Sequence, residues 1–188
     1  MKRLELPTEI LPVSSIVKEP TIVPDASGYY CWFFKRAPHI LPVKNCSLVQ
    51  GLPPLYIGIA KSSEKSKSSL RKRIYRNHIN GRARQSTLRL SLGVILSEES
   101  GYFLRLHKNE KRKYWLASKG EAWLSSWMNE NAFVGFVECC DPKAVEKALI
   151  QHYNPPLNIN HSNNEFSKKL KSMRETQQKY ARQSPPAF

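Results

Sequence analysis

The placement of the prolines limits where this 188-residue chain can form helices and strands. Four of them, separated by stretches that contain apolar residues, fall within residues 1–27: Pro7, Pro12, Pro20 and Pro24. Because proline lacks a backbone N–H and breaks helices and central strands, we expect residues 1–27 to form an extended arm over a core. A second proline-rich stretch, residues 38–54, predicts a long irregular connection, and Pro155-Pro156 ends the helix before it.

Between these prolines, strand-like and helix-like patterns alternate. Runs rich in aromatic and β-branched residues predict strands at 28–34, 55–60 and 133–139, with shorter ones at 102–106 and 113–116. Apolar periodicity and capping residues predict helices at 70–80, directly after Ser86, and at 118–131, 142–153 and 165–182. The expected fold is α/β, a small antiparallel β-sheet of about three core strands flanked by helices.

The same pattern predicts one compact domain with an arm and a tail. The arm is 1–27, the domain is 28–160, and a basic C-terminal helix and tail follow at 161–188. Within the domain we interpret 38–54 as an insertion and 101–117 as a basic hairpin-like segment. A composition of 40% hydrophobic and 10% aromatic residues is sufficient to build a core of this size.

Several classes of protein are disfavoured by what the sequence lacks. No apolar run approaches the roughly 18 residues that a spanning helix needs, so we expect no membrane partner. The first residues show no apolar stretch with a small-residue cleavage site, which predicts a cytoplasmic protein. The cysteines, Cys31, Cys46, Cys139 and Cys140, have no C-x-x-C spacing, so reduced thiols are a simpler interpretation than disulfides or zinc ligands.

The charge of the chain is large and uneven. Lys and Arg number 30 against 15 Asp and Glu, a formal net charge of +15. The basic residues gather in three clusters, at 61–89, 105–119 and 168–182. This asymmetry favours a polyanionic partner, nucleic acid first and an anionic membrane surface second, while a merely solvated basic surface is the alternative.

A few polar residues stand where chemistry is conceivable. Glu146 falls on the same helix side as Leu149, Ile150 and Tyr153, so its carboxylate needs a partner, which can be a basic residue, a backbone donor or a metal. The plain alternative is a salt bridge at the edge of the core. His78 shares a side with Ile74, and a buried structural histidine is its ordinary interpretation.

Taken together, four segments are more specific than any one residue. Gly28-Tyr29-Tyr30 and Tyr56-Ile57-Gly58 lie in successive predicted strands, and Arg73 and His78 lie on the next helix. Glu146 opens Glu-Lys-Ala-Leu-Ile, and Asn158 ends Pro-Pro-Leu-Asn. In this order the segments resemble the GIY-YIG nuclease family over roughly residues 28–160, and the flanking sequences are similar to small, stand-alone bacterial members.

The chain departs from the family pattern at three places. Tyr29 replaces the isoleucine of the first motif. The connection between Tyr30 and Tyr56 is much longer than the family's usual hairpin. The spacing from Arg73 to His78 is about one residue longer than the family's.

The resemblance implies a metal-dependent endonuclease that hydrolyses phosphodiester bonds in DNA. Glu146 would hold one divalent metal, Mg²⁺ first and Mn²⁺ second, and Arg73 would bind a phosphate oxygen. Tyr30 would act as general base on the attacking water, with His78 as the other candidate for that role. Tyr56 would orient the water or the phosphate, and Asn158 would fix the substrate or the tyrosine geometry.

Basic residues near these positions are expected to hold the DNA backbone without reading its sequence. We assign this role to Lys61, Arg71, Arg76, Arg82, Arg84 and Arg89. The substrate can be duplex or branched DNA, or RNA, and the role restriction, defence or DNA processing; a homodimer is one route to double-strand cleavage. The competing interpretation is a catalytically inactive nucleic-acid-binding module of the same fold, and a membrane-surface or ribosome-associated protein is a weaker third.

Overall fold

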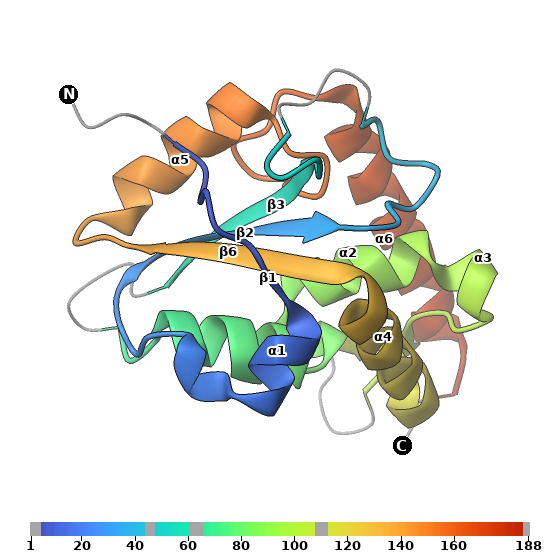
Figure 1. The fold of residues 1–188 in the computed structure, drawn as a ribbon. Helices are drawn as coiled ribbons and strands as arrows, with labels where there is room; N and C mark the ends of the chain where they lie inside the picture. The colour runs from blue at the N-terminus through green and yellow to red at the C-terminus, as the bar shows by residue number, and fades with distance from the viewer. Residues whose placement is uncertain (1–4, 44–47, 61–65, 108–112, 186–188) are drawn as a thin grey trace.

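The computed structural model describes residues 5–43, 48–60, 66–107 and 113–185. Its centre is an antiparallel sheet of four strands in the order β1-β6-β2-β3 (Figure 1). The strands are β1 (Leu11–Pro12), β2 (Gly28–Phe34), β3 (Pro54–Ala60) and β6 (Ala132–Glu138). The predicted α/β class, with a small antiparallel sheet flanked by helices, is confirmed, although the sheet has four strands rather than about three.

Strand β2 lies inside the sheet, and all seven of its residues are buried. Because successive side chains of a strand point to opposite faces, Tyr30 and Trp32 enter the larger core while Cys31 and Phe33 enter the smaller one. The seven-residue aromatic run therefore supplies both cores, which makes β2 the strand around which the rest of the molecule packs.

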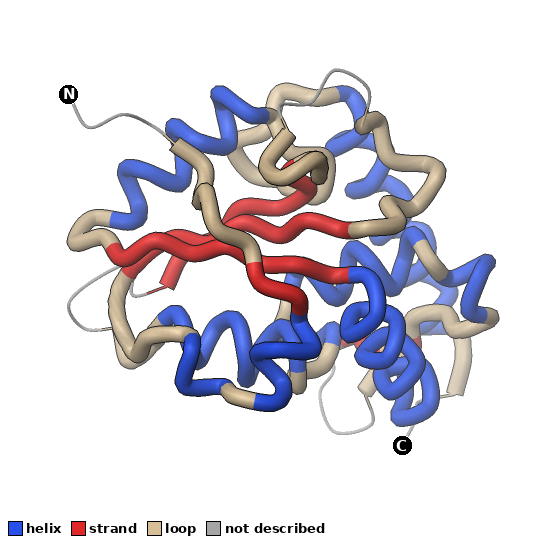
Figure 2. Tube along the Cα trace, viewed as in Figure 1, coloured by secondary structure: helices blue, strands red, loops and turns tan. Residues whose placement is uncertain are grey.

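Helices cover both faces of the sheet (Figures 1 and 2). Helix α5 (Pro142–Tyr153) packs on the smaller core, with Leu149 and Ile150 buried against β2 and β3. The opposite face carries α1 (Val13–Lys18), η2 (Lys72–Ile79), α2 (Thr87–Ile95) and α4 (Ala117–Asn131). Short helices η1 (Pro20–Ile22), η3 (Ala83–Gln85) and α3 (Ser97–Ser100) connect these elements.

The final helix, α6 (Glu165–Gln183), packs against α2 and against the small hairpin-like pair β4 (Arg105–Leu106) and β5 (Tyr114–Trp115). β4 and β5 pair antiparallel, as the sequence predicts, but each is only two residues long. Part of the basic turn between them, 108–112, lies outside the described residues.

The N-terminal segment is more regular than an extended arm. β1 joins the sheet through β6, and α1 buries Val13 and Ile16. The proline argument was wrong here because the prolines flank the regular elements instead of interrupting them. Pro12 stands at the edge of the sheet, where a missing N–H is tolerated, and it precedes the first residue of α1.

The predicted helix at 70–80 exists, but most of it is a π-helix. Residues 72–79 have this conformation, and the N–H of Asn80 donates to the carbonyl of Tyr75, five residues back, at 2.9 Å. In such a helix, residues five apart lie about one turn apart, and π turns occur frequently at functional sites. The wider turn therefore absorbs the extra residue between Arg73 and His78.

Candidate active site

The strand pairing of β2 with β3 places Tyr30 directly opposite Gly58. A Cβ added at Gly58 would lie 2.5 Å from Oη of Tyr30, and one added at Gly28 would lie 2.1 Å from the carbonyl oxygen of Val137. Neither position has room for a side chain. The two glycines of the motifs therefore permit close packing, and Gly58 leaves the space that the Tyr30 phenol occupies.

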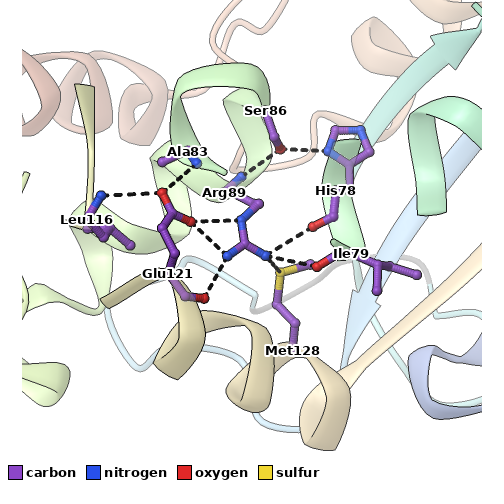
Figure 3. Close-up of polar contacts among 8 residues, drawn as sticks. All are labelled: His78, Ile79, Ala83, Ser86, Arg89, Leu116, Glu121 and Met128. Atoms are coloured by element: carbon purple, nitrogen blue, oxygen red, sulfur yellow. Dashed lines mark hydrogen bonds and ion pairs between the residues drawn. The ribbon is translucent and has the colours of Figure 1, made fainter. Parts of the chain in front are cut away.

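Tyr30 begins a chain of buried hydrogen bonds. Its Oη lies 2.7 Å from Nε2 of His78, and Nδ1 of His78 lies 2.7 Å from Oγ of Ser86. Ser86 is the N-cap of α2, and its Oγ accepts the backbone N–H of Arg89 at 3.1 Å, a contact visible in Figure 3. All three side chains of this relay are buried, Tyr30 and His78 completely.

Once the Tyr30 phenol has lost its proton and its oxygen only accepts, the relay favours one tautomer of His78. Within the described residues, Ser86 Oγ has two polar partners, and since it accepts from Arg89 N–H, its own proton is free to go to Nδ1 of His78. The proton of the neutral imidazole then sits on Nε2, which donates to Tyr30. The opposite tautomer leaves a buried hydroxyl proton of Ser86 without an acceptor, which costs about 1–3 kcal/mol.

Electrostatics keep the relay uncharged in the free protein. Burial lowers the pKa of His78 well below its ordinary value, and the positive charges of Arg73 and Arg89 lower it further. Burial raises the pKa of Tyr30, the Tyr56 phenol adds to the rise, and the charge and hydrogen bonding of Arg73 oppose it. Both groups are therefore neutral near pH 7.

The structure also has a cleft of about 400 Å³. Tyr56, Glu146 and Asn158 line it, together with Thr87 at the start of α2 and Arg174 of α6. Oη of Tyr56 lies 3.0 Å from Oγ1 of Thr87, and burial raises the pKa of Tyr56 while this hydrogen bond opposes the rise. Of the two motif tyrosines, Tyr56 is the one that lines the cleft.

Arg73 links the cleft to the relay. Burial raises the pKa of Glu146, and the charge of Arg73 opposes this rise. The nearby Tyr30 phenol raises the pKa of the Arg73 guanidinium most strongly, and Tyr56 and Glu146 contribute in the same direction. A single half-buried guanidinium thus interacts with both tyrosines and with the carboxylate.

Asn158 is attached to β3 by two hydrogen bonds. Its Oδ1 accepts from the N–H of Ile57 and its Nδ2 donates to the carbonyl of the same residue, both at 2.8 Å. The neighbouring Leu157 N–H donates to the carbonyl of Leu55 at 2.9 Å. This double attachment holds the backbone of β3 next to Tyr56.

Arg89 does not fit the predicted DNA contact. Its side chain is completely buried, and its Nη2 lies 2.8 Å from Oε2 of Glu121 on α4 (Figure 3). Nη1 donates to the carbonyls of His78 and Ile79 at 3.2 and 3.1 Å. The sequence expectation was wrong because a basic cluster does not distinguish an exposed arginine from one that a distant acid neutralises.

The other residues predicted to contact the DNA backbone differ in their exposure. Arg76 and Arg82 are exposed, and Arg82 lies over the Trp115 ring at 5.2 Å from its centroid. Arg71 is half-buried and donates from Nε to the carbonyl of Val23 at 2.7 Å, and Arg84 is also half-buried. Lys61 lies outside the described residues.

Two of the residues that complete this site were predicted only in part or not at all. Ser86 is expected as a helix cap, a role that the structure confirms, but its contact with His78 requires the folded chain. Arg174 belongs to the predicted basic final helix, yet no local pattern marks it as a neighbour of Tyr56 and Glu146.

A model of the GIY-YIG catalytic domain matches residues 28–176, which is most of the chain. The protein therefore belongs to the GIY-YIG catalytic domain family, a family of endonucleases that act on DNA. No curated protein and no solved structure matches the chain. None of the helices in the described part of the chain is sufficiently long and apolar to span a bilayer.

The donor set fits one kind of metal site. The described residues contain no cluster of three or more His, Cys, Asp or Glu side chains that would enclose an ion. Glu146 supplies one carboxylate to the cleft, and Glu175, the other acid that lines it, lies 4.0 Å from Lys171. One carboxylate with open space fits Mg²⁺, which keeps several waters and completes its shell with substrate phosphate.

Proposed function

We propose that this protein is a metal-dependent endonuclease that hydrolyses phosphodiester bonds in DNA. The observation that carries the proposal is that Tyr56 and Glu146 line one cleft, while Arg73 is close enough to interact with both of them and with Tyr30, which is paired with His78. A carboxylate, a guanidinium and ionisable phenols are the groups that phosphodiester hydrolysis requires. A binding module has no need of this combination.

Each side chain then has one task. Glu146 would hold Mg²⁺, or Mn²⁺ in its place, and the metal when bound neutralises charge on the scissile phosphate and the leaving oxygen. Arg73 binds a phosphate oxygen with its planar fork. Tyr56 orients the water or the phosphate from the wall of the cleft.

We propose that Tyr30, rather than His78, takes the proton of the attacking water. His78 is completely buried and already directs its Nε2 at Tyr30, so it supports the phenolate oxygen by donating a hydrogen bond. Tyr30 is itself completely buried and interacts with Arg73, so we propose that the guanidinium turns toward the bound phosphate before water reaches the phenol. Substrate binding therefore exposes the base.

The pH dependence distinguishes the two candidate bases. Because the pKa of Tyr30 is raised, cleavage through its phenolate becomes faster as pH rises from 7 to 9.5, up to tenfold for each pH unit. Because the pKa of His78 is lowered, cleavage through a neutral imidazole is independent of pH over the same range. Single-turnover rates at saturating Mg²⁺ across this range decide between them.

The first test is nicking of supercoiled plasmid with Mg²⁺, with EDTA and with Glu146→Gln. We expect cleavage with Mg²⁺ and none in the other two reactions. Glu130→Gln is the matched control, because Glu130 is an exposed acid on α4 away from the cleft, and it should cut like the wild type. Retardation of DNA without cleavage of plasmid, branched junctions or RNA would support the inactive binding module instead.

The products identify the finer role. Discrete fragments indicate a sequence-specific restriction-like enzyme, whereas cleavage confined to junctions indicates DNA processing. One cleft cuts one strand, so linear product at low enzyme concentration requires either a homodimer or two successive nicks. The order of the reaction in protein concentration separates these two routes.

A further inference from the structure

A second hollow adjoins the catalytic cleft. Its volume is about 780 Å³, and it lies between α6 on one side and η3, the start of α2 and β5 on the other. Thr87, Arg174 and Gln178 line both hollows. The two therefore form one continuous depression that leads from Glu146 along α6.

The lining of the second hollow is strongly cationic. Arg84, Lys113, Arg174 and Arg182 contribute to it, and no Asp or Glu is among the described residues that line it. Gln85, Gln178 and Tyr114 add neutral hydrogen-bonding groups. Four cations beside polar uncharged groups match the chemistry of a sugar–phosphate chain.

Arg174 lies at the junction of the two hollows. Its side chain is half-buried, and burial lowers its pKa while the Tyr56 phenol opposes this effect. Within the described residues no hydrogen bond or ion pair to Arg174 is found, and the adjacent Glu175 is directed to Lys171 at 4.0 Å. A partly desolvated guanidinium gains when an anion binds beside it.

Arg182 lines the second hollow only, and Tyr114 holds it in place. Its Nε donates to Oη of Tyr114 at 2.6 Å, and its guanidinium carbon lies 5.8 Å from the centroid of the same ring. This contact uses Nε and leaves the terminal nitrogens for a ligand. Because the side chain is ordered before binding, less conformational entropy is lost when it meets a phosphate.

We propose that this α6 groove, defined by Arg84, Lys113, Arg174 and Arg182, binds the backbone of the nucleic-acid strand that continues from the scissile bond. Arg174 contacts a phosphate next to the one that is cut, and Arg182 contacts a phosphate further along. This inference rests on the proposed nuclease function and adds the path of the strand. A free phosphate or mononucleotide would occupy one hollow only.

The test compares two variants of α6 with equal loss of charge. Arg174→Gln/Arg182→Gln removes two groove arginines, and Lys169→Gln/Lys179→Gln removes two exposed lysines that line neither hollow. Binding of a labelled oligonucleotide duplex is followed by fluorescence anisotropy in EDTA from 50 to 300 mM salt. We expect the slope of log affinity against log salt to shrink by about 1.8 for the groove variant, about 0.9 for each phosphate lost.

Oligonucleotides with a single methylphosphonate linkage, moved stepwise along the strand, locate the contact. When the methylphosphonate replaces one particular phosphate near the cleavage position, the wild type should lose affinity several-fold. The same replacement should not weaken binding by Arg174→Gln, because that variant already lacks the contact. Arg174→Lys retains the charge, so it should keep the wild-type salt slope and shows whether the position tolerates change. Thermal unfolding of every variant must match the wild type within 2 °C before its binding is compared.

The outcomes separate the groove from the nuclease. Equal slopes for the two double variants, or a methylphosphonate effect that is additive with Arg174→Gln at every linkage, would overturn the groove. Binding is measured in EDTA and therefore does not depend on cleavage. If the salt slope shrinks only in the groove variant but the wild type does not cleave DNA, the groove proposal stands and the proposed nuclease function is wrong. Free phosphate that displaces the duplex with the same affinity as the duplex itself would also overturn the proposal that a strand follows the groove.

Discussion

The two arginines that lower the pKa of His78, Arg89 and Arg73, each have a glutamate neighbour, and the two pairs differ in how completely protein groups satisfy them. In the first, Arg89 and Glu121 form a closed network: Oε1 of Glu121 accepts from the N–H of Ala83 at 2.8 Å and of Leu116 at 3.3 Å (Figure 3). In the second, the charges of Arg73 and Glu146 act on each other, but the described residues show no ion pair between them, and both are only half-buried.

The difference shows how to tell a structural ion pair from a functional one. The Arg89–Glu121 pair joins α2 to α4 and to the end of η2, and its donors and acceptors are occupied by protein. A saturated pair has no capacity left for a ligand. Glu146 lines a cleft and Arg73 is near enough to act on its pKa, so this pair retains the capacity to bind metal and phosphate.

The largest expected effect is on stability in the closed network. Glu121→Gln leaves the Arg89 guanidinium buried without its counter-charge, so the free energy of unfolding should fall by about 3–5 kcal/mol. Glu146→Gln should leave stability unchanged or slightly raised, because burial already disfavours the ionised form of that carboxylate. Urea unfolding at pH 7.5 measures the free energy of unfolding of both variants. Equal losses of stability would contradict the distinction between the two pairs.

Exchange of arginine for lysine sharpens the same contrast in activity. Arg73→Lys keeps the charge but loses the planar fork, so we expect a decrease of about 10²–10³-fold in cleavage rate with little change in stability. Arg89→Lys should lower the melting temperature instead, since lysine cannot reach Glu121 and both backbone carbonyls together. A cleavage defect in Arg89→Lys protein that is fully folded would contradict the assignment.

A smaller effect concerns acid stability through His78. Below its ordinary pKa of about 6.5 the unfolded chain protonates this residue, whereas the folded chain, in which the pKa is lowered, does not. The unfolded state then binds more protons, so stability falls on acidification, by about 1.4 kcal/mol between pH 7.5 and 5.5. His78→Gln should lose this component, and His152→Gln, which changes an exposed histidine, should retain it.

The smallest expected effect is that of the cap. Ser86→Ala removes the acceptor for the Arg89 N–H and should lower stability by about 1 kcal/mol. It also frees Nδ1 of His78 to carry the proton, so Nε2 no longer donates to Tyr30 and the alkaline rise of the cleavage rate should move to higher pH. Ser86→Thr, which keeps the hydroxyl, is the control, and an unmoved pH profile in Ser86→Ala would remove Ser86 from the relay.

The strands and most helices were predictable because their signals are local. The aromatic run 28–34, the Asp141-Pro142 helix start and the capping Ser86 each depend on neighbours in sequence, and the structure has β2, α5 and α2 at these places. The π-helix was not predictable from apolar periodicity, since Leu70, Ile74 and His78 also fit an α-helix. The unusual spacing of Arg73 and His78 was the one sign of it.

The site was predictable only as far as the family resemblance reached. The resemblance grouped Tyr30, Tyr56, His78 and Glu146 into one predicted site. In the structure, Tyr56 and Glu146 line one cleft, and Tyr30 and His78 share a hydrogen bond. The resemblance could not show that Tyr30 is completely buried, because burial depends on packing by distant elements. Charge clusters were the weakest guide: Arg89 pairs with an acid 32 residues away, and Arg174 reaches the cleft from the last helix.

The attachment of Asn158 to Ile57 has a consequence for the behaviour of this protein at high concentration. Sheet edges with free backbone groups are templates on which other chains add strands and aggregate. Here the outer side of β3 is occupied by Asn158 and Leu157, and the opposite edge is the two-residue β1, which ends in a proline. Loss of the Asn158 amide therefore opens β3 to self-association, so insolubility should precede any loss of fold.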